Sequence, residues 1–195
     1  IFLGGLPAGQ DSNLRIGKSN IAVAELDESD ESFLEPDCHI AVATNIEPEH
    51  LDHYGDFEAE KRAYCRFAAG VAEKGIFIAG ADNKEATAIF QMHGGRRCLA
   101  GLDPAADVRA VRIESANGRR RFLLVEGGQE RGWFEISLPG LHNIQNALCA
   151  IAAVRALGGD LEKIRNSLPN CTGVARRFEV VGGKRGITAV DDYAH

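Results

Sequence analysis

Short uninterrupted apolar runs alternate along this chain with amphipathic stretches, a pattern typical of an α/β fold. After a Gly-rich opening, expected to be a short strand and a loop, such runs occur at 21–24, 40–43 and 76–79 and end abruptly in polar residues. Strands without polar alternation are expected in a parallel sheet whose two faces are both covered. We therefore predict three buried strands, with 21–24 and 40–43 as parallel neighbours.

Helical spacing of apolar residues separates the second and third of these runs. Between residues 56 and 74 the apolar positions lie on one helical face, with Asp56 as the expected N-cap and Glu58 and Glu60 suited to the first turn. Gly75 is expected to end this helix. Three further helices are predicted, from Asp82 to Met92, from His142 to Leu157 and from Asp160 to Pro169.

The pattern changes to alternating strands in the second half of the chain. Strand-like segments at 107–113, 120–126 and 133–138 are separated by Asn117-Gly118 and Gly127-Gly128, which are typical turn pairs. We expect an antiparallel meander at the edge of the sheet, and two last strands at 177–182 and 187–191. The predicted fold class is α/β: a doubly wound, mostly parallel sheet flanked by helices, with an antiparallel edge meander.

Composition narrows the possible partners. The 195 residues are 45% hydrophobic and 26% charged, the balance of a globular protein, and 22 Lys and Arg against 28 Asp and Glu give a net charge of −6. No basic run is long enough to follow a phosphate backbone, and no apolar run could span a bilayer. We expect no nucleic-acid partner, no membrane partner and no signal peptide.

Cysteine usage points to a reducing compartment. The chain has five cysteines, an odd number, with long gaps and no C-x-x-C pair. We interpret them as reduced, buried residues of a cytoplasmic protein rather than as disulfides or zinc ligands. They are Cys38, Cys65, Cys98, Cys149 and Cys171.

An acidic cluster follows the first apolar run. Glu25 stands at the carboxyl end of the predicted strand 21–24, with Asp27, Glu28 and Asp30 close behind. Carboxylates packed together repel one another unless a cation or solvent relieves them. The segment is either a divalent metal site or a solvated acidic loop.

A histidine follows the second run. His50 lies in the segment 45–52, and adjacent parallel strands end at one edge of a sheet, so Glu25 and His50 can converge there. Magnesium prefers oxygen ligands, whereas manganese tolerates an imidazole better. The alternative for His50 is a capping or surface residue.

Other polar side chains can be interpreted either as structural or surface residues or as functional ones. Asn143 and Asn146 share a helical face, and their amides can either read an adenine edge or cap the helix. Arg177 can clamp a transferring phosphoryl group or lie on the surface. Asp192 and His195, taken alone, also suit a surface.

Taken in order, these motifs resemble the Mur ligase family. The segments are AELDESDESF, NIEPEHLDHYG, HNIQNA, RRFE and DDYAH, and they cover essentially the whole chain. The resemblance implies that 1–173 is most of a central ATP-binding domain and that 174–195 opens a C-terminal amino-acid-binding domain, with the boundary in the coil at 170–174. No G-x-x-x-x-G-K-[ST] phosphate loop occurs, and the chain begins at Ile1 rather than Met, so we expect it to be part of a longer protein.

The resemblance also implies roles for particular residues. Glu25 and His50 match metal-binding positions, and His50 and Arg177 are the candidate catalytic residues, with Arg177 beside the transferred phosphate. The nucleotide-contacting positions are His142, Asn143, Asn146, Asp192 and His195. Some relatives carry a carbamylated lysine after the metal histidine; Lys61 lies in that region, and we interpret it as a surface helix residue.

The implied activity is an ADP-forming amide ligation. ATP, with Mg²⁺ or with Mn²⁺ in its place, would activate the lactyl carboxylate of UDP-N-acetylmuramate as an acyl phosphate, which L-alanine then attacks. Two alternatives stay open: a relative that attaches a tripeptide to the same muramate in cell-wall recycling, and a non-catalytic module that has lost the phosphate loop. The isolated chain is expected to be inactive.

Overall fold

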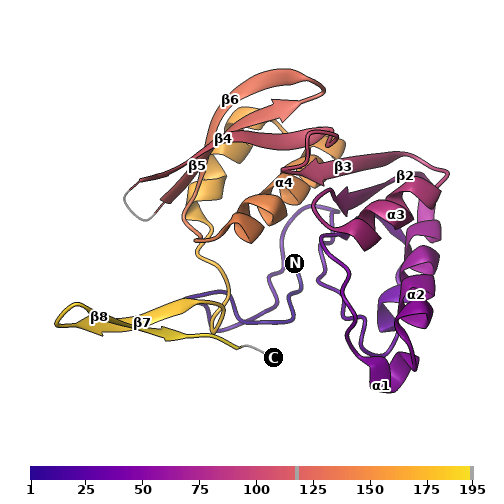
Figure 1. The fold of residues 1–195 in the computed structure, drawn as a ribbon, viewed down its shortest axis with the longest axis horizontal. Coiled ribbons are helices and arrows are strands. Elements are labelled where there is room, and N and C mark those ends of the chain that lie inside the picture. The colour runs from indigo at the N-terminus through magenta and orange to yellow at the C-terminus, as the bar shows by residue number, and fades with distance from the viewer. Residues whose placement is uncertain (117–118, 194–195) are drawn as a thin grey trace. The chain divides into compact units, whose positions relative to one another are not determined.

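The computed structural model describes residues 1–116 and 119–193, which form two compact units (Figure 1). The sheet unit is Glu28–Cys171, and the terminal unit combines Ile1–Asp27 with Thr172–His195. The divisions between the units fall after Asp27 and after Cys171. No helix in the described part of the chain is long and apolar enough to cross a membrane.

The sheet unit is built on one six-stranded sheet in the order β1-β2-β3-β4-β5-β6. β1 to β4 pair in parallel, and β4 to β6 form an antiparallel meander. This arrangement confirms the predicted fold class. The strands are β1 Cys38–Ala43, β2 Val71–Gly80, β3 Arg97–Gly101, β4 Val108–Ala116, β5 Arg119–Glu126 and β6 Gln129–Ile136.

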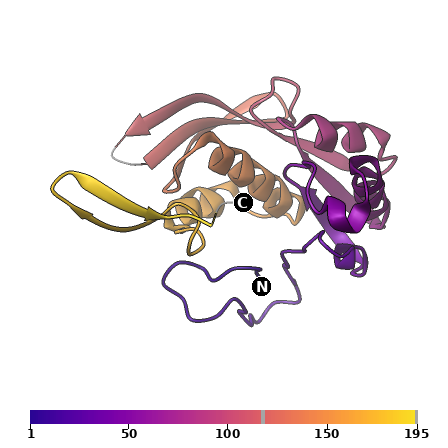
Figure 2. The same cartoon turned by 60° about the horizontal axis from the view of Figure 1, so that its bottom comes forward.

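Helices cover both faces of the sheet. Along β2, Ile78 joins the core beneath α4, whereas its neighbours Phe77 and Ala79 join the core beneath α2 and α3. Figure 2 shows α4 running beneath the meander strands. Burial on both faces explains why these strands lack polar alternation. The helices are α1 Leu51–Tyr54, α2 Phe57–Ala69, α3 Lys84–Met92, α4 Leu141–Ala156 and α5 Leu161–Ser167, with 3₁₀ turns η1 Ser32–Leu34 and η2 Leu168–Asn170.

Two predicted helix caps and one predicted turn are confirmed. The Asp56 side chain accepts a hydrogen bond from the Ala59 N–H at 2.7 Å, and the Asp160 side chain accepts one from Lys163 at 3.0 Å. Gly127 and Gly128 both have positive φ at the β5–β6 turn. The other predicted turn, Asn117-Gly118, lies outside the described residues.

The apolar run at 21–24 is not a strand of the sheet, and that prediction is wrong. It lies in the terminal unit, where its backbone bonds Phe2 instead: Phe2 N–H donates to Val23 O at 2.8 Å, and Glu25 N–H donates to Phe2 O at 2.9 Å. Val23 stays 52% exposed. Hydrophobic continuity predicts burial but does not say which backbone a segment pairs with, and β1 pairs with β2.

Two predicted helix boundaries are also wrong. α2 ends at Gly70, so 71–74 belong to β2. Gly75 instead sits where β1 and β2 approach closely, since a Cβ there would lie 2.4 Å from His39 O. α3 is capped by Asn83, whose side chain accepts from the Ala86 N–H at 2.9 Å, and not by Asp82.

The terminal unit carries the last strands. β7 Glu179–Lys184 and β8 Ile187–Asp191 form an antiparallel hairpin, close to the predicted 177–182 and 187–191.

The five cysteines are free, as predicted, but they are not uniformly buried. Cys149 is buried, three are partly buried, and Cys171 is exposed, so the burial prediction is wrong for Cys171. Burial raises the pKa of the Cys98 and Cys149 thiols to about 12, which makes both poor nucleophiles at neutral pH.

The two faces of α4 give a stability prediction. Leu148 is fully buried against the sheet, whereas Leu141 on the same helix is 49% exposed. Leu148→Ala should lower the free energy of unfolding by about 3 kcal/mol, because it removes packed methyl groups and leaves a cavity. Leu141→Ala is the matched control and should change it by less than about 1 kcal/mol. Urea unfolding of both variants measures the difference, and equal losses would contradict this account of the core.

Candidate functional site

A cavity of about 330 Å³ opens at the carboxyl ends of β1 and β2, beside the start of α4. In doubly wound sheets this edge is where ligands bind. Two of the predicted nucleotide-contacting residues, His142 and Asn146, line it. The full lining is Thr44, Asn45, Glu47, Gly80, Asp82, Asn83, His142, Gln145 and Asn146.

Close approach of two loops shapes the floor of this cavity. A Cβ on Gly80 would lie 1.9 Å from Thr44 O, so only glycine allows the end of β2 to pass so near the end of β1. The Asn83 side chain then joins the loops, because its Nδ2 donates to Ile46 O at 3.2 Å while its oxygen caps α3. The Asp82 carboxylate accepts from the Leu102 N–H at 2.8 Å, which ties the same edge to the chain after β3.

The start of α4 adds polar groups to the cavity wall. Its N-cap is Gly140, which has no side chain to accept from the first-turn N–H groups. Those N–H groups carry the positive end of the helix dipole, a setting that suits a polar or anionic ligand. Asn143 does not line the cavity, because its Nδ2 donates to Pro139 O at 2.6 Å and lies 3.1 Å from His142 Nε2.

His50 lies beside two carboxylates in the sheet unit. Its Nε2 is 3.6 Å from Glu28 Oε1 and 3.9 Å from Glu49 Oε2, and one ligand atom from each residue falls within 4.8 Å of the others. One imidazole and two carboxylates form a donor set that fits Mn²⁺ and, with several retained waters, Mg²⁺. Glu28 and Glu49 were visible in the sequence only as members of acidic segments.

A buried carboxyl group, that of Glu60, is hydrogen-bonded to the backbone of this cluster. Glu60 is 1% exposed, and its Oε2 accepts from the Glu49 N–H at 3.2 Å. Burial raises the pKa of Glu60, and the Glu49 N–H opposes that rise. The sequence analysis assigned Glu60 to the first turn of the helix because of its charge and did not predict its burial. The spacing already indicated burial, because Glu60 lies three residues after Phe57 and four before Tyr64, on the apolar face of α2.

Lys61 is held in ion pairs. Its Nζ lies 2.5 Å from Glu58 Oε1 and 3.5 Å from Glu85 Oε2, so it links α2 to α3. The hydrogen bond to Glu58 raises the pKa of Lys61. Lys61 is thus a partly exposed residue of α2 that makes ion pairs, and its interpretation as an unmodified surface residue stays a prediction.

The remaining predicted residues lie in the terminal unit. Glu25 Oε2 accepts from the Gly4 N–H at 2.9 Å. Arg177 Nη1 donates to Tyr193 O at 3.2 Å, and Asp192 Oδ1 accepts from the Phe178 N–H at 3.3 Å, so Arg177 and Asp192 come together at the open end of the β7–β8 hairpin. The pairing of Glu25 with His50 joins two units and stays a prediction, and His195 lies outside the described residues.

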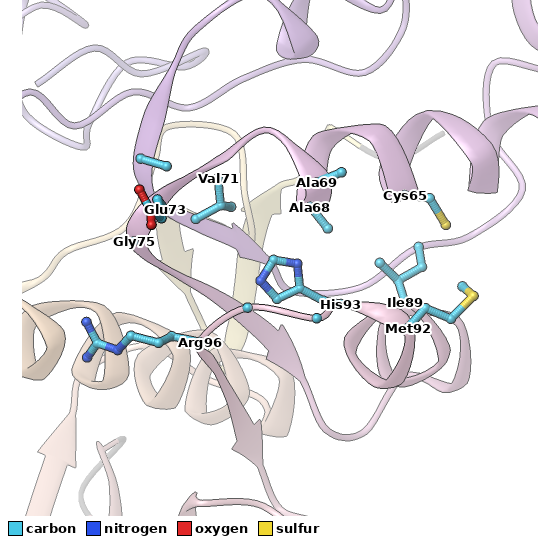
Figure 3. Close-up of a pocket in the computed structure, with 13 residues that line it drawn as sticks. Cys65, Ala68, Ala69, Val71, Glu73, Gly75, Ile89, Met92, His93 and Arg96 are labelled. Atoms are coloured by element: carbon cyan, nitrogen blue, oxygen red, sulfur yellow. The ribbon is translucent and has the colours of Figure 1, made fainter.

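A second cavity, of about 410 Å³, contains none of the predicted residues (Figure 3). It lies between the ends of α2 and α3 at the amino end of β2, so the length of that strand separates it from the first cavity. The His93 ring projects into its middle. We therefore assign the candidate site to the cavity at the carboxyl edge.

Fold and site together define a doubly wound α/β domain with a polar cavity at its carboxyl edge. Residues 11–154 match the Mur ligase middle domain. This chain therefore belongs to the Mur ligase family.

Individual relatives agree with this assignment. The UDP-N-acetylmuramate–L-alanine ligase of Sorangium cellulosum is 38% identical over 195 residues, which is 100% of this chain and 42% of that protein. The crystal structure of the UDP-N-acetylmuramate-alanine ligase of Thermotoga maritima superposes with a TM-score of 0.84 at 25% identity, over 100% of this chain and 44% of that one. A tripeptide ligase from Neisseria meningitides, 23% identical with a TM-score of 0.76 over 90% of this chain and 58% of that one, shares the fold. The chain thus spans about 42% of the length of the curated relative.

The two asparagines of α4 should behave differently when replaced. Asn143→Ala removes the bond to Pro139 O and should lower the free energy of unfolding by about 1 kcal/mol. Asn146→Ala removes a cavity-lining amide and should weaken ATP binding while changing stability by less than about 0.5 kcal/mol. Urea unfolding and calorimetric ATP titration of the full-length variants separate the two effects. The reverse pattern would contradict these placements.

Proposed function

We propose that the protein containing this chain is an ADP-forming, ATP-dependent amide ligase that joins L-alanine to the lactyl carboxylate of UDP-N-acetylmuramate. The observation that carries this proposal is the 38% identity, over the whole chain, to a relative named for that reaction. Such a reaction serves peptidoglycan precursor synthesis, and hence cell shape and division. It draws on small-molecule substrates in the cytoplasm, with no nucleic-acid or membrane partner.

ATP would occupy the cavity at the carboxyl edge. The Asn146 amide offers a donor and an acceptor together, which is what an adenine edge requires, and His142 lies beside it on the wall. Asn143 would act indirectly, by holding the loop at Pro139 through its hydrogen bond. In the terminal unit, Asp192 would contact the ribose and His195 would lie near the nucleotide.

A divalent ion would be held by His50 and Glu25. The carboxylates beside His50 support this role, because they supply negative charge and oxygen ligands where the ion would lie. Mg²⁺ bound there would supply charge neutralisation for the phosphate oxygens.

The chemistry then needs positioning and charge stabilisation more than a protein nucleophile. A lactyl carboxylate oxygen attacks the γ-phosphorus of ATP, ADP leaves, and an acyl phosphate forms. The amine of L-alanine attacks the acyl carbon, phosphate leaves, and the amine loses its proton as the amide forms. Arg177 would balance the negative charge on the transferred group, a role in which a guanidinium can bind two oxygens at once.

The domain organisation is part of the same proposal. Residues 1–173 would form most of the central ATP-binding domain, and 174–195 would begin the domain that binds the amino acid.

Glu25→Ala in the full-length protein should reduce ATP-dependent phosphate release by at least about 100-fold, because it removes a ligand of the divalent ion that would neutralise charge on the reacting phosphates. Phosphate release with UDP-N-acetylmuramate and L-alanine measures this. Glu73→Ala is the matched control, and this variant should retain parental activity. Glu73 is exposed at the amino end of β2, whereas the candidate site lies at the carboxyl end of that strand. A Glu25→Ala rate within a factor of two of the parent would remove Glu25 from the site.

The same assay tests the acceptor. Phosphate release should require L-alanine, and the tripeptide L-alanyl-γ-D-glutamyl-meso-diaminopimelate should not replace it. Release with the tripeptide alone would support the recycling ligase instead, and the absence of release with either acceptor would support a non-catalytic module.

A further inference from the structure

Glu60 is an unusual residue for the place it occupies. Among the residues whose exposure the structure describes, it is the one buried charged side chain. A buried carboxylate is costly unless it is hydrogen-bonded, and the bond that the structure provides is the one from the Glu49 N–H, 3.2 Å away. Its carboxyl group is therefore committed to the backbone immediately before His50.

The backbone at His50 needs such support. His50 has φ 51° and ψ 35°, a left-handed conformation that is unfavourable for a residue with a Cβ and persists only when its surroundings hold it. On its C-terminal side, the His50 carbonyl accepts from the N–H groups of His53 and Tyr54, at 2.9 and 3.0 Å. On its N-terminal side, the Glu60 carboxylate holds the Glu49 N–H.

The turn fixed in this way sets where the imidazole lies. Its Nε2 faces Glu28 and Glu49 at 3.6 and 3.9 Å. Glu28 is itself anchored, because the Tyr54 hydroxyl donates to Glu28 O at 2.5 Å. Loss of the Glu60 contact would release the Glu49 N–H and allow the His50 turn to relax away from these carboxylates.

We propose that Glu60 is a positioning residue that holds His50 in the geometry needed to bind a divalent cation. This role rests on the proposed function, in which His50 is a metal ligand. Glu60 acts through the Glu49 N–H rather than by touching the ion. Residues that orient metal ligands in this way typically change metal affinity by about 10- to 100-fold when they are replaced.

Mn²⁺ titration of the full-length protein, followed by the paramagnetic signal of free Mn²⁺, tests the role without measuring activity. Glu60→Leu keeps the volume but removes the acceptor, and it should weaken Mn²⁺ binding at least about 10-fold. Glu60→Gln keeps an oxygen acceptor and should stay within about 3-fold of the parent. Glu58→Leu, two residues earlier on the exposed side of α2, is the matched control and should bind Mn²⁺ like the parent.

The same substitution in a His50→Ala variant separates a role of Glu60 in positioning His50 from a role in the stability of the whole domain. In His50→Ala, which should itself weaken Mn²⁺ binding, adding Glu60→Leu should cause no further loss, because the ring to be positioned is gone. An equal further loss, or parental affinity in Glu60→Leu alone, would overturn the proposal. If Glu60→Leu does not fold, Glu60→Met tests the same loss of acceptor with a more adaptable side chain.

If His50 is not a metal ligand, the Mn²⁺ titrations give a different result from the one that overturns the role of Glu60 alone. Parental Mn²⁺ affinity in His50→Ala would show that His50 is not a ligand, and the metal role of Glu60 would fall with it. Amide hydrogen exchange at Glu49 tests the structural step by itself: it should accelerate at least about 10-fold in Glu60→Leu and much less in Glu60→Gln. Unchanged exchange in Glu60→Leu would overturn the proposed hold on the turn.

Discussion

The parallel pairing of β1 with β2 is the interaction on which the candidate site depends. It brings Thr44–Asn45 and Gly80–Asn83 to one edge of the sheet, where Gly80 allows the two loops to pass in close contact. The first turns of α4 then reach this edge because the apolar face of the helix packs on Ile78 and Ala100. His142 and Asn146 thus reach the cavity as a consequence of core packing.

Charge balance organises the region beside this edge. Glu28 and Glu49 lie beside the His50 imidazole, and Coulombic repulsion from both adds to the effect of burial in raising the pKa of Glu60. Lys61, the next residue along α2, points instead to Glu58 and Glu85. The excess negative charge around His50 is therefore not neutralised by that lysine, an arrangement that favours a cation.

Much of the fold followed from sequence pattern because it depends on local chemistry. The Asp56 and Asp160 caps, the Gly127-Gly128 turn and α4 each need only neighbouring residues, and the structure has them as predicted. The predictions were wrong where contacts between residues far apart in the sequence decide which element a segment forms. The run at 21–24 is as apolar as β1, yet its backbone bonds Phe2. α2 stops at Gly70 because Val71 begins β2 and pairs with Cys38 of β1.

In the candidate site, too, local features followed from the sequence and long-range contacts did not. The sequence by itself determined the residue types available for chemistry and the apolar runs that became β1 and β2, since residue type and hydrophobic period are local properties. The two strands predicted to end at one edge were 21–24 and 40–43, whereas the structure pairs β1 with β2. Only the tertiary structure decided that Asn143 bonds Pro139 while Asn146 lines the cavity, and that Glu60 turns inward to hold the Glu49 N–H. Those outcomes depend on which backbone groups arrive beside each side chain, and that is set by packing between segments far apart in the chain.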